Sequence, residues 1–130
     1  MEPINIKGAQ DTPEVILDKE NNIFKMEGKS FPADVGIFYK PIIDWIDDYS
    51  DSPLDKTTFI LKMDYFNTAS SKVILDILYK LEDMSLDGKE ILVKWYYPDD
   101  DEDMMETGEE YDEIVDVPFE LIEYTPEYQD

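Results

Sequence analysis

The amino-acid sequence predicts an α/β fold, in which helices pack against one mixed β-sheet. The first observation is the order of the elements: strand, strand, helix, strand, helix, strand, acidic segment, strand. A helix between two strands of one sheet makes a crossover, and crossovers join parallel strands. The second observation is size, because 130 residues, 42% of them hydrophobic, suffice for one core. Residues 1–130 are therefore expected to form a single domain.

Five segments have the apolar, β-branched and aromatic composition of strands. The polar stretch between the first two favours a hairpin turn, because its asparagines tolerate left-handed backbone. The longest segment, "TTFILKMDYF", is apolar on both faces and is therefore expected in the middle of the sheet. The predicted strands span residues 15–18, 24–27, 59–65, 91–96 and 119–123.

Two amphipathic segments, around residues 42–49 and 69–81, predict the helices that pack on this sheet. Asp34 is placed to cap the first helix at its N-terminus. Pro41 lies inside the apolar pattern, which indicates either a kinked helix or one that begins at Pro41. The apolar stripes consist of Phe38, Ile42, Trp45, Ile46 and Tyr49 in the first helix and of Val73, Ile74, Ile77, Leu78 and Leu81 in the second.

The charge of the chain is strongly negative and unevenly distributed. Eleven lysines oppose 33 Asp and Glu residues, arginine and histidine are absent, and the formal net charge is −22. Residues 95–130 hold fifteen of the acids and no lysine. Such a surface repels nucleic acids and the anionic headgroups of membranes. The expected partners are therefore proteins, which present basic or apolar surfaces.

The sequence also bears on cellular location. No apolar run approaches the roughly 20 residues of a membrane-spanning helix. The N-terminus "MEPINIKG" lacks the basic start and apolar core of a signal peptide, and the chain contains no cysteine. A cytoplasmic protein is the expectation.

The residue types that most enzymes use for catalysis are missing. Without histidine and cysteine the chain has no nucleophile–histidine pair and no ordinary zinc site, and its five scattered glycines form no phosphate-binding loop. Carboxylates remain, above all in the acidic segment 99–113. An EF-hand register fails there, because the sixth position is Met104 when the loop begins at Asp99. No catalytic residue, metal ligand or cofactor is predicted.

The acidic segment admits more than one role. It is expected to be a short surface helix or an ordered loop, with apolar contacts from Met104, Met105 and Tyr111. Pro98 followed by acids suits a helix start at that point. The segment either serves as a solvated charged face or contacts a partner through its first acids, which are Asp99, Asp100 and Asp101. A small carboxylate-based or divalent-metal-dependent enzyme that uses this segment is the alternative function.

The turn "DYFNTASSK" joins the predicted central strand to the second helix. Either Asn67 or Thr68 can cap that helix, because a helix N-terminus leaves backbone N–H groups without partners. A cap needs one such residue, whereas this turn also offers Ser70 and Ser71. The end of a central strand is a frequent ligand site, and a helix N-terminus tolerates a phosphate. The turn is therefore a candidate for binding or modification as well as for capping.

Four long motifs follow one another between residues 12 and 124: "TPEVILD", "GKSFPADVGIFYKPIIDWIDDY", "DYFNTASSK" and "VKWYYPDDDEDMMETGEEY". In sequence and in order they resemble the SiaC-like family of bacterial regulatory phosphoproteins. The resemblance implies a small α/β protein that is not an enzyme. It also implies three partners. They are a diguanylate cyclase that the unphosphorylated form binds and activates, a dedicated protein kinase, and a PP2C-type phosphatase. The resemblance further implies that activation of the cyclase raises cyclic di-GMP and favours biofilm or aggregation.

The resemblance places the phosphorylated threonine of the family at Thr68. Ala69 departs from the serine that often follows this threonine in the family, but the acceptor hydroxyl is retained. A modified hydroxyl at the start of a helix is also similar to the STAS-type anti-sigma-factor antagonists, so a STAS-like general arrangement is expected. The other residues expected in the phosphosite turn and partner surface are Tyr65, Phe66, Asn67, Ser70, Ser71 and Lys72.

Overall fold

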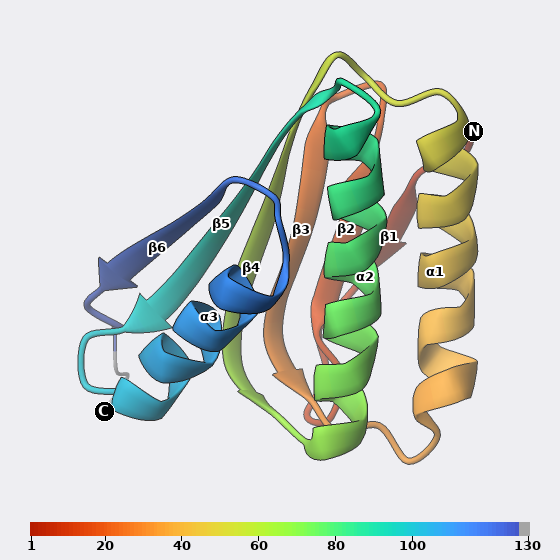
Figure 1. The fold of residues 1–130 in the computed structure, drawn as a ribbon. Coiled ribbons are helices and arrows are strands. Elements are labelled where there is room, and N and C mark those ends of the chain that lie inside the picture. The colour runs from red at the N-terminus through yellow and green to blue at the C-terminus, as the bar shows by residue number, and fades with distance from the viewer. Residues whose placement is uncertain (128–130) are drawn as a thin grey trace.

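The computed structural model describes residues 1–127, which form six strands and three helices (Figure 1). All six strands belong to one sheet, in which they lie side by side in chain order. The predicted α/β class is confirmed. The elements are β1 (Ile4–Ile6), β2 (Glu14–Asp18), β3 (Ile23–Ser30), α1 (Val35–Asp51), β4 (Lys56–Phe66), α2 (Thr68–Leu86), β5 (Glu90–Pro98), α3 (Glu102–Ile114) and β6 (Phe119–Tyr124).

The sheet is mixed, as expected from the two kinds of connection. Strands β1, β2 and β3 pair antiparallel, whereas β3, β4, β5 and β6 pair parallel, with one helix in each parallel crossover. Strand β4 lies between β3 and β5, which confirms the central position predicted for residues 59–65. The sequence does not predict strand β1, because three residues are too few to show a periodicity.

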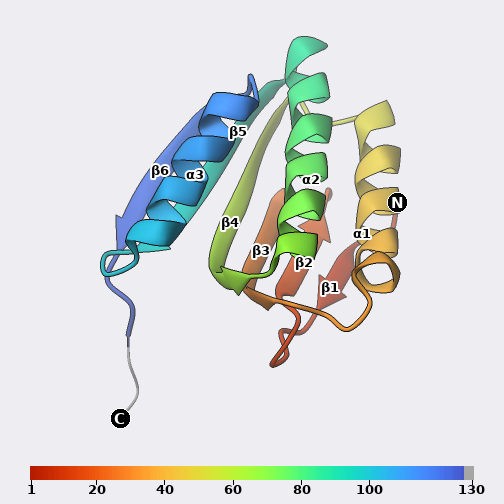
Figure 2. The ribbon, with the colours of Figure 1, turned by 60° about the horizontal axis from the view of Figure 1, so that its bottom comes forward.

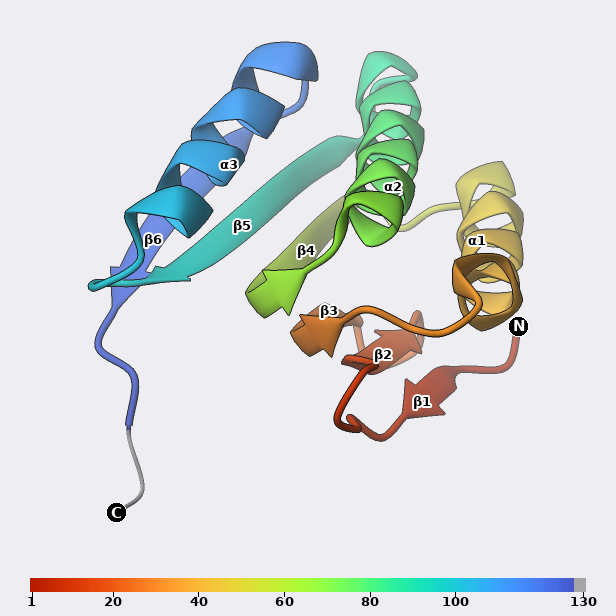
Figure 3. The same ribbon diagram turned by 90° about the horizontal axis from the view of Figure 1, so that it is seen from below.

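All three helices lie on the same side of the sheet (Figures 2 and 3). The parallel strands follow one another in one direction, so each right-handed crossover places its helix on the same face. In β4 the side chains of Phe59, Leu61 and Met63 face the helices and are buried. The alternate residues Ile60 and Lys62 are only half-buried. The position of β4 in the middle of the sheet is as predicted, but only the face of β4 that the helices cover is fully buried.

The N-terminus of α1 confirms the predicted cap and decides the role of Pro41. Asp34 accepts a hydrogen bond from the backbone N–H of Ile37 at 3.0 Å through its side-chain Oδ1. The helix begins at Val35, so Pro41 lies inside it, at an exposed position, and does not start it.

None of the helices formed by residues 1–127 combines the length and apolar character that crossing a membrane requires.

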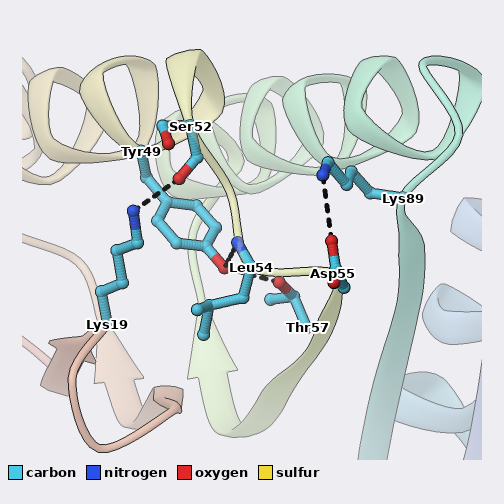
Figure 4. A network of polar contacts seen from close by, with 7 residues as sticks. All are labelled: Lys19, Tyr49, Ser52, Leu54, Asp55, Thr57 and Lys89. Carbon is cyan, nitrogen blue, oxygen red and sulfur yellow. Dashed lines mark hydrogen bonds and ion pairs between the residues drawn. The ribbon is translucent and has the colours of Figure 1, made fainter.

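A polar network holds the opposite end of α1 against the sheet (Figure 4). The hydroxyl of Tyr49 lies 2.6 Å from Thr57 Oγ1 and accepts from the backbone N–H of Leu54 at 3.1 Å. Lys19 Nζ donates to the carbonyl oxygen of Ser52 at 2.6 Å. These bonds fix the connection from α1 into β4, and β4 carries the chain to the candidate site at its other end.

Candidate functional site

The candidate site is the turn between β4 and α2, at the carboxyl end of a central strand (Figure 1). Asn67 caps α2, because its Oδ1 accepts from the backbone N–H of Ser70 at 2.9 Å. The N–H of Asn67 in turn donates to the carbonyl oxygen of Ser30, at the end of β3. Thr68 is the first residue of the helix and its side chain is exposed. Of the two caps that the sequence allows, the structure uses Asn67.

A buried cluster of three hydroxyls supports this turn from inside. Ser30 Oγ donates to Ser70 Oγ at 2.8 Å and lies 2.6 Å from the hydroxyl of Tyr39. Ser30 and Ser70 are fully buried, and burial raises the pKa of the Tyr39 hydroxyl, which therefore stays neutral. The cluster ties β3, α1 and α2 together beneath Thr68. Ser70 belongs to this interior cluster, which corrects its expected place on a partner surface.

Aromatic side chains flank the turn on its outer side. Tyr65 is 51% exposed and its ring meets that of Phe31, which is 37% exposed, with the centroids 5.8 Å apart. Phe66 is half-buried, edge-on to Trp95. Lys72 is exposed one turn further along α2. Aromatic residues are enriched at protein–protein interfaces, so these exposed rings make the outer side of the turn a candidate contact surface.

Helix α3 confirms the helical reading of the acidic segment but begins later than predicted. Strand β5 pairs with β6 as far as Pro98, and the N–H of Asp99 donates to the carbonyl oxygen of Tyr124, so the chain is still bonded to β6 at this point. Asp101 then caps α3 by accepting from the N–H of Met104 at 2.9 Å. The prediction of a helix start at Pro98 is wrong, because pairing with β6 holds that residue in the sheet.

The apolar face of α3 lies on the last two strands. The indole Nε1 of Trp95 donates to the carbonyl oxygen of Met104 at 3.0 Å, and the Trp95 ring contacts Tyr111. Met104 and Tyr111 are buried and Met105 is half-buried, which confirms the contacts predicted for this segment. Gly108 faces Trp95 so closely that no side chain fits between them.

One side of α3 also reaches the turn that contains Thr68. The hydroxyl of Tyr111 donates to the carbonyl oxygen of Ser71 at 2.9 Å, and Ser71 Oγ donates to the carbonyl oxygen of Thr68 at 2.7 Å. Between the two helices lies a cavity of about 340 Å³. Its lining residues are Phe66, Asn67, Thr68, Ser71, Thr107, Glu110 and Tyr111.

The contact of Tyr111 predicts a loss of stability at high pH. Burial raises the pKa of its hydroxyl from 10.0 to about 12, and the charge of Glu110 acts in the same direction. The folded pKa lies above the unfolded one, so the neutral hydroxyl contributes fully below about pH 10 and its contribution is lost as the pH rises toward 12. Chemical unfolding of wild type and Tyr111→Phe should show the wild type losing stability relative to the variant above pH 10. A constant difference between the two would contradict the assignment.

The acidic residues at the start of α3 lie close to the turn. Asp99 and Asp100 are exposed, and Asp99 Oδ2 accepts from Thr125 Oγ1 at 2.9 Å. Asp101 shares a cavity of about 270 Å³ with Tyr65 and Phe66. The structure therefore brings two of the predicted groups together, the turn and the acidic segment. Within residues 1–127 no three Asp or Glu side chains converge as metal ligands.

Sequence reasoning missed the residues that connect the turn to the rest of the molecule. Ser30 lies 40 positions before Ser70 in the chain, and no local pattern links Ser30 or Tyr39 to it. For Tyr111 the sequence predicts an apolar contact but not the hydrogen bond to Ser71, which lies 40 positions earlier in the chain. Pairings over such distances leave no periodic signal in a single sequence.

Residues 6–124 match the model of the SiaC family of regulatory phosphoproteins. An uncharacterised protein of Pseudomonas aeruginosa strain UCBPP-PA14 is 29% identical over 121 residues, which cover 93% of this chain and 96% of that protein.

Two solved structures from Pseudomonas aeruginosa share the fold. The crystal structure of apo-SiaC has a TM-score of 0.85 and 29% sequence identity, and the match covers 94% of this chain and 99% of that one. The second is the diguanylate cyclase SiaD in complex with its activator SiaC, with a TM-score of 0.86, 28% identity, and coverage of 93% and 99%. Because the family model spans nearly the whole chain, this protein belongs to the SiaC family of regulatory phosphoproteins.

Proposed function

We propose that this protein is a phosphorylation-switched regulator that, in its unphosphorylated form, binds and activates a diguanylate cyclase. Phosphorylation of Thr68 releases the cyclase, which lowers cyclic di-GMP and opposes biofilm formation or aggregation. One observation carries the assignment of Thr68: Asn67 provides the helix cap, and the hydroxyl of Thr68 is left exposed. A phosphate can therefore be added and removed without breaking the cap. The SiaD–SiaC complex supports the choice of partner.

The covalent steps belong to the partners. A dedicated kinase joins Thr68 Oγ to the γ-phosphorus of ATP, ADP leaves, and the hydroxyl proton passes to a base of the kinase. A metal-dependent phosphatase of the PP2C type then hydrolyses the ester, so that water forms the new bond to phosphorus and the Thr68 hydroxyl is restored. This chain contributes only the acceptor hydroxyl, so in this proposal it is not itself an enzyme. The proposal also places the protein in the cytoplasm.

The neighbouring hydroxyls are poor alternatives to Thr68. Ser70 is fully buried and bonded to Ser30, so a kinase cannot reach it without opening the core. Ser71 is half-buried and its hydroxyl already donates to the carbonyl oxygen of Thr68. Incubation with the kinase should therefore add a single phosphate to wild type and none to Thr68→Ala, as read by intact mass. Phosphate on the Thr68→Ala protein would reassign the site.

Substitution of Thr68 should separate folding from regulation. Thr68→Ala removes an exposed hydroxyl that caps nothing, so it should cost well under the roughly 0.5–2 kcal/mol of a lost cap. It should bind the cyclase as wild type does and stay active in the presence of the kinase. The phosphorylated protein should bind far more weakly, because a group carrying about −1.5 to −2 charges must lose its water at the interface. Thr68→Asp brings a single charge and should weaken binding incompletely.

Isothermal titration calorimetry with the diguanylate cyclase of the same organism measures these affinities. Ser71→Ala serves as the matched control, since it removes a neighbouring hydroxyl from the same helical turn. Equal affinity of the phosphorylated and unphosphorylated proteins for the cyclase would end the proposal, and Thr68 would be only the first residue of α2.

The acidic start of α3 should affect the rate of association with the cyclase. Replacing Asp99, Asp100 and Asp101 by asparagine removes three charges beside the turn, while Asp101→Asn keeps a side-chain oxygen that can cap α3. Association at low salt should slow and folding should be unchanged, because surface charges steer encounter more than they set affinity. Stopped-flow mixing measures the rate. The control variant replaces Asp48, Asp51 and Asp83 by asparagine. These three acids lie on the parts of α1 and α2 that are far from the turn.

If the two triple variants associate at the same rate, total charge alone explains the effect. The segment beside the turn would then have no specific part in binding.

A further inference from the structure

Two hydrogen bonds attach α3 to α2. The backbone N–H of Asp116, just after α3, donates to Glu82 Oε2. At the other end of α2 the hydroxyl of Tyr111 donates to the carbonyl oxygen of Ser71. Ser71 lies in the same helical turn as Thr68 and donates its own hydroxyl to the Thr68 carbonyl. The second attachment of α3 is therefore made to the turn that carries the proposed phosphorylation site.

The surroundings of this attachment are negatively charged. Helix α3 holds seven Asp and Glu residues among its thirteen, and no lysine. Thr68 and Glu110 line one cavity between the helices, and none of the residues 1–127 that line it is a lysine. A phosphate on Thr68 would therefore bring about −1.5 to −2 further charges next to the carboxylate of Glu110 and the hydroxyl of Tyr111.

The two hydroxyl donors that line the cavity beside Thr68 and Tyr111 are already engaged. In the cavity, Ser71 Oγ donates to the carbonyl oxygen of Thr68, and Thr107 Oγ1 donates to that of Asp103. Lys72 stands four residues after Thr68, outside the cavity and exposed. An ion pair with an exposed lysine stabilises little, so it offsets the repulsion inside the cavity only in part.

We propose that phosphorylation of Thr68 acts inside the chain as well as at the interface, by repelling Glu110 and loosening α3 from the first turn of α2. This inference rests on the proposed phosphorylation of Thr68 and adds its structural consequence. Helix α3 then shifts or becomes less ordered. The strands β5 and β6, on which α3 packs, and the rest of the sheet remain folded.

Hydrogen exchange of the full-length protein tests this consequence, with phosphothreonine placed at position 68 during synthesis so that no kinase is needed. Phosphorylation should speed hydrogen exchange of the α3 amides about fivefold, because interactions between exposed charges change equilibrium constants by up to about that factor. The exchange of the α1 amides should not change. Tyr111→Phe, which lacks the hydrogen bond to Ser71, should show faster α3 exchange even without phosphate. Unchanged α3 exchange on phosphorylation of the wild type would overturn the proposal.

Reversing one charge should reverse the effect. In Glu110→Lys an ammonium replaces a carboxylate that lines the cavity, so phosphorylation should slow α3 exchange. Glu109→Lys makes the same change on α3 at a residue that does not line the cavity, and phosphorylation should still speed exchange. In Lys72→Gln the acceleration should be at least as large as in wild type. The same response in the Glu110 and Glu109 variants would show that the cavity plays no part.

The cyclase titrations distinguish this inference from the function it rests on. If phosphorylation weakens cyclase binding but α3 exchange stays the same, the switch works at the interface alone and the α3 proposal fails. If phosphorylation loosens α3 but cyclase affinity is unchanged, the proposal for α3 holds and the proposed function fails.

Discussion

Gly108→Ala should destabilise the protein and displace α3 from the sheet. A Cβ at this position would lie 2.5 Å from Trp95 Cδ1, 2.6 Å from its Nε1 and 2.7 Å from Leu121 Cδ2. The Trp95 ring is fully buried and its Nε1 is bonded to Met104, so it cannot turn away without losing that bond. Crowding of this kind costs roughly 1–3 kcal/mol. Alanine regains at most about 1 kcal/mol through its helix propensity, so the net effect is a loss.

The free energy of unfolding from urea titration measures this loss. Tryptophan fluorescence reports on the environment of the Trp95 ring. Gly36→Ala is the matched control, because it makes the same substitution in the first turn of another helix. A Cβ there would meet only Asp34 Oδ1, at 3.5 Å. Its stability should stay equal to that of wild type or increase. If both variants are equally stable, α3 is not seated on Trp95 as described.

Ser30→Ala should be the second costly substitution, although it removes only one oxygen. Ser30 Oγ is the centre of the buried hydroxyl cluster, bonded to both Tyr39 and Ser70. Without it both of these buried hydroxyls lose a partner and keep only the contact between Tyr39 and Ser70. Each buried hydrogen bond that is lost costs about 0.5–1.5 kcal/mol. The turn should also loosen, because the cluster holds it from below. Faster hydrogen exchange of the Asn67 amide, which donates to the Ser30 carbonyl, would report this.

Tyr39→Phe provides the comparison for Ser30→Ala. It removes a terminal hydroxyl of the same cluster but leaves the bond between Ser30 and Ser70 in place, so the loss of stability should be smaller. Equal losses in the two variants would show that Ser30 does not hold the cluster together. Thermal unfolding of the two proteins under one set of conditions decides between these outcomes.

Local patterns in the sequence were enough for most of the elements. The β-branched run at residues 59–65 and the stripe that contains Ile42 and Trp45 indicate a strand and a helix, since each period of side chains allows only one backbone geometry to bury them. The cap at Asp34 is also a local feature. Composition alone excluded the histidine- and cysteine-based catalysts, since the residues that such chemistry needs are absent.

The sequence predicted where the turn of the candidate site lies, but not the contacts that hold it. The motif around Thr68 places the turn, and helix capping explains why one of its polar residues is structural. Which residue caps the helix depends on the path of β4 into the turn, and that path is held by the bond from Asn67 to Ser30 on β3. The sequence therefore allowed both Asn67 and Thr68, and only the fold left Thr68 exposed.

By itself the sequence determined the α/β class, the acidic surface and the location of the turn that contains Thr68, because each depends on residue types and on short-range periodicity. Tertiary structure decided which face of the sheet is covered, that Ser70 is buried with Ser30, and that Tyr111 reaches Ser71. These features depend on contacts between residues far apart in the chain. Such contacts form only when the handedness of the crossovers and the order of the strands have brought the elements together.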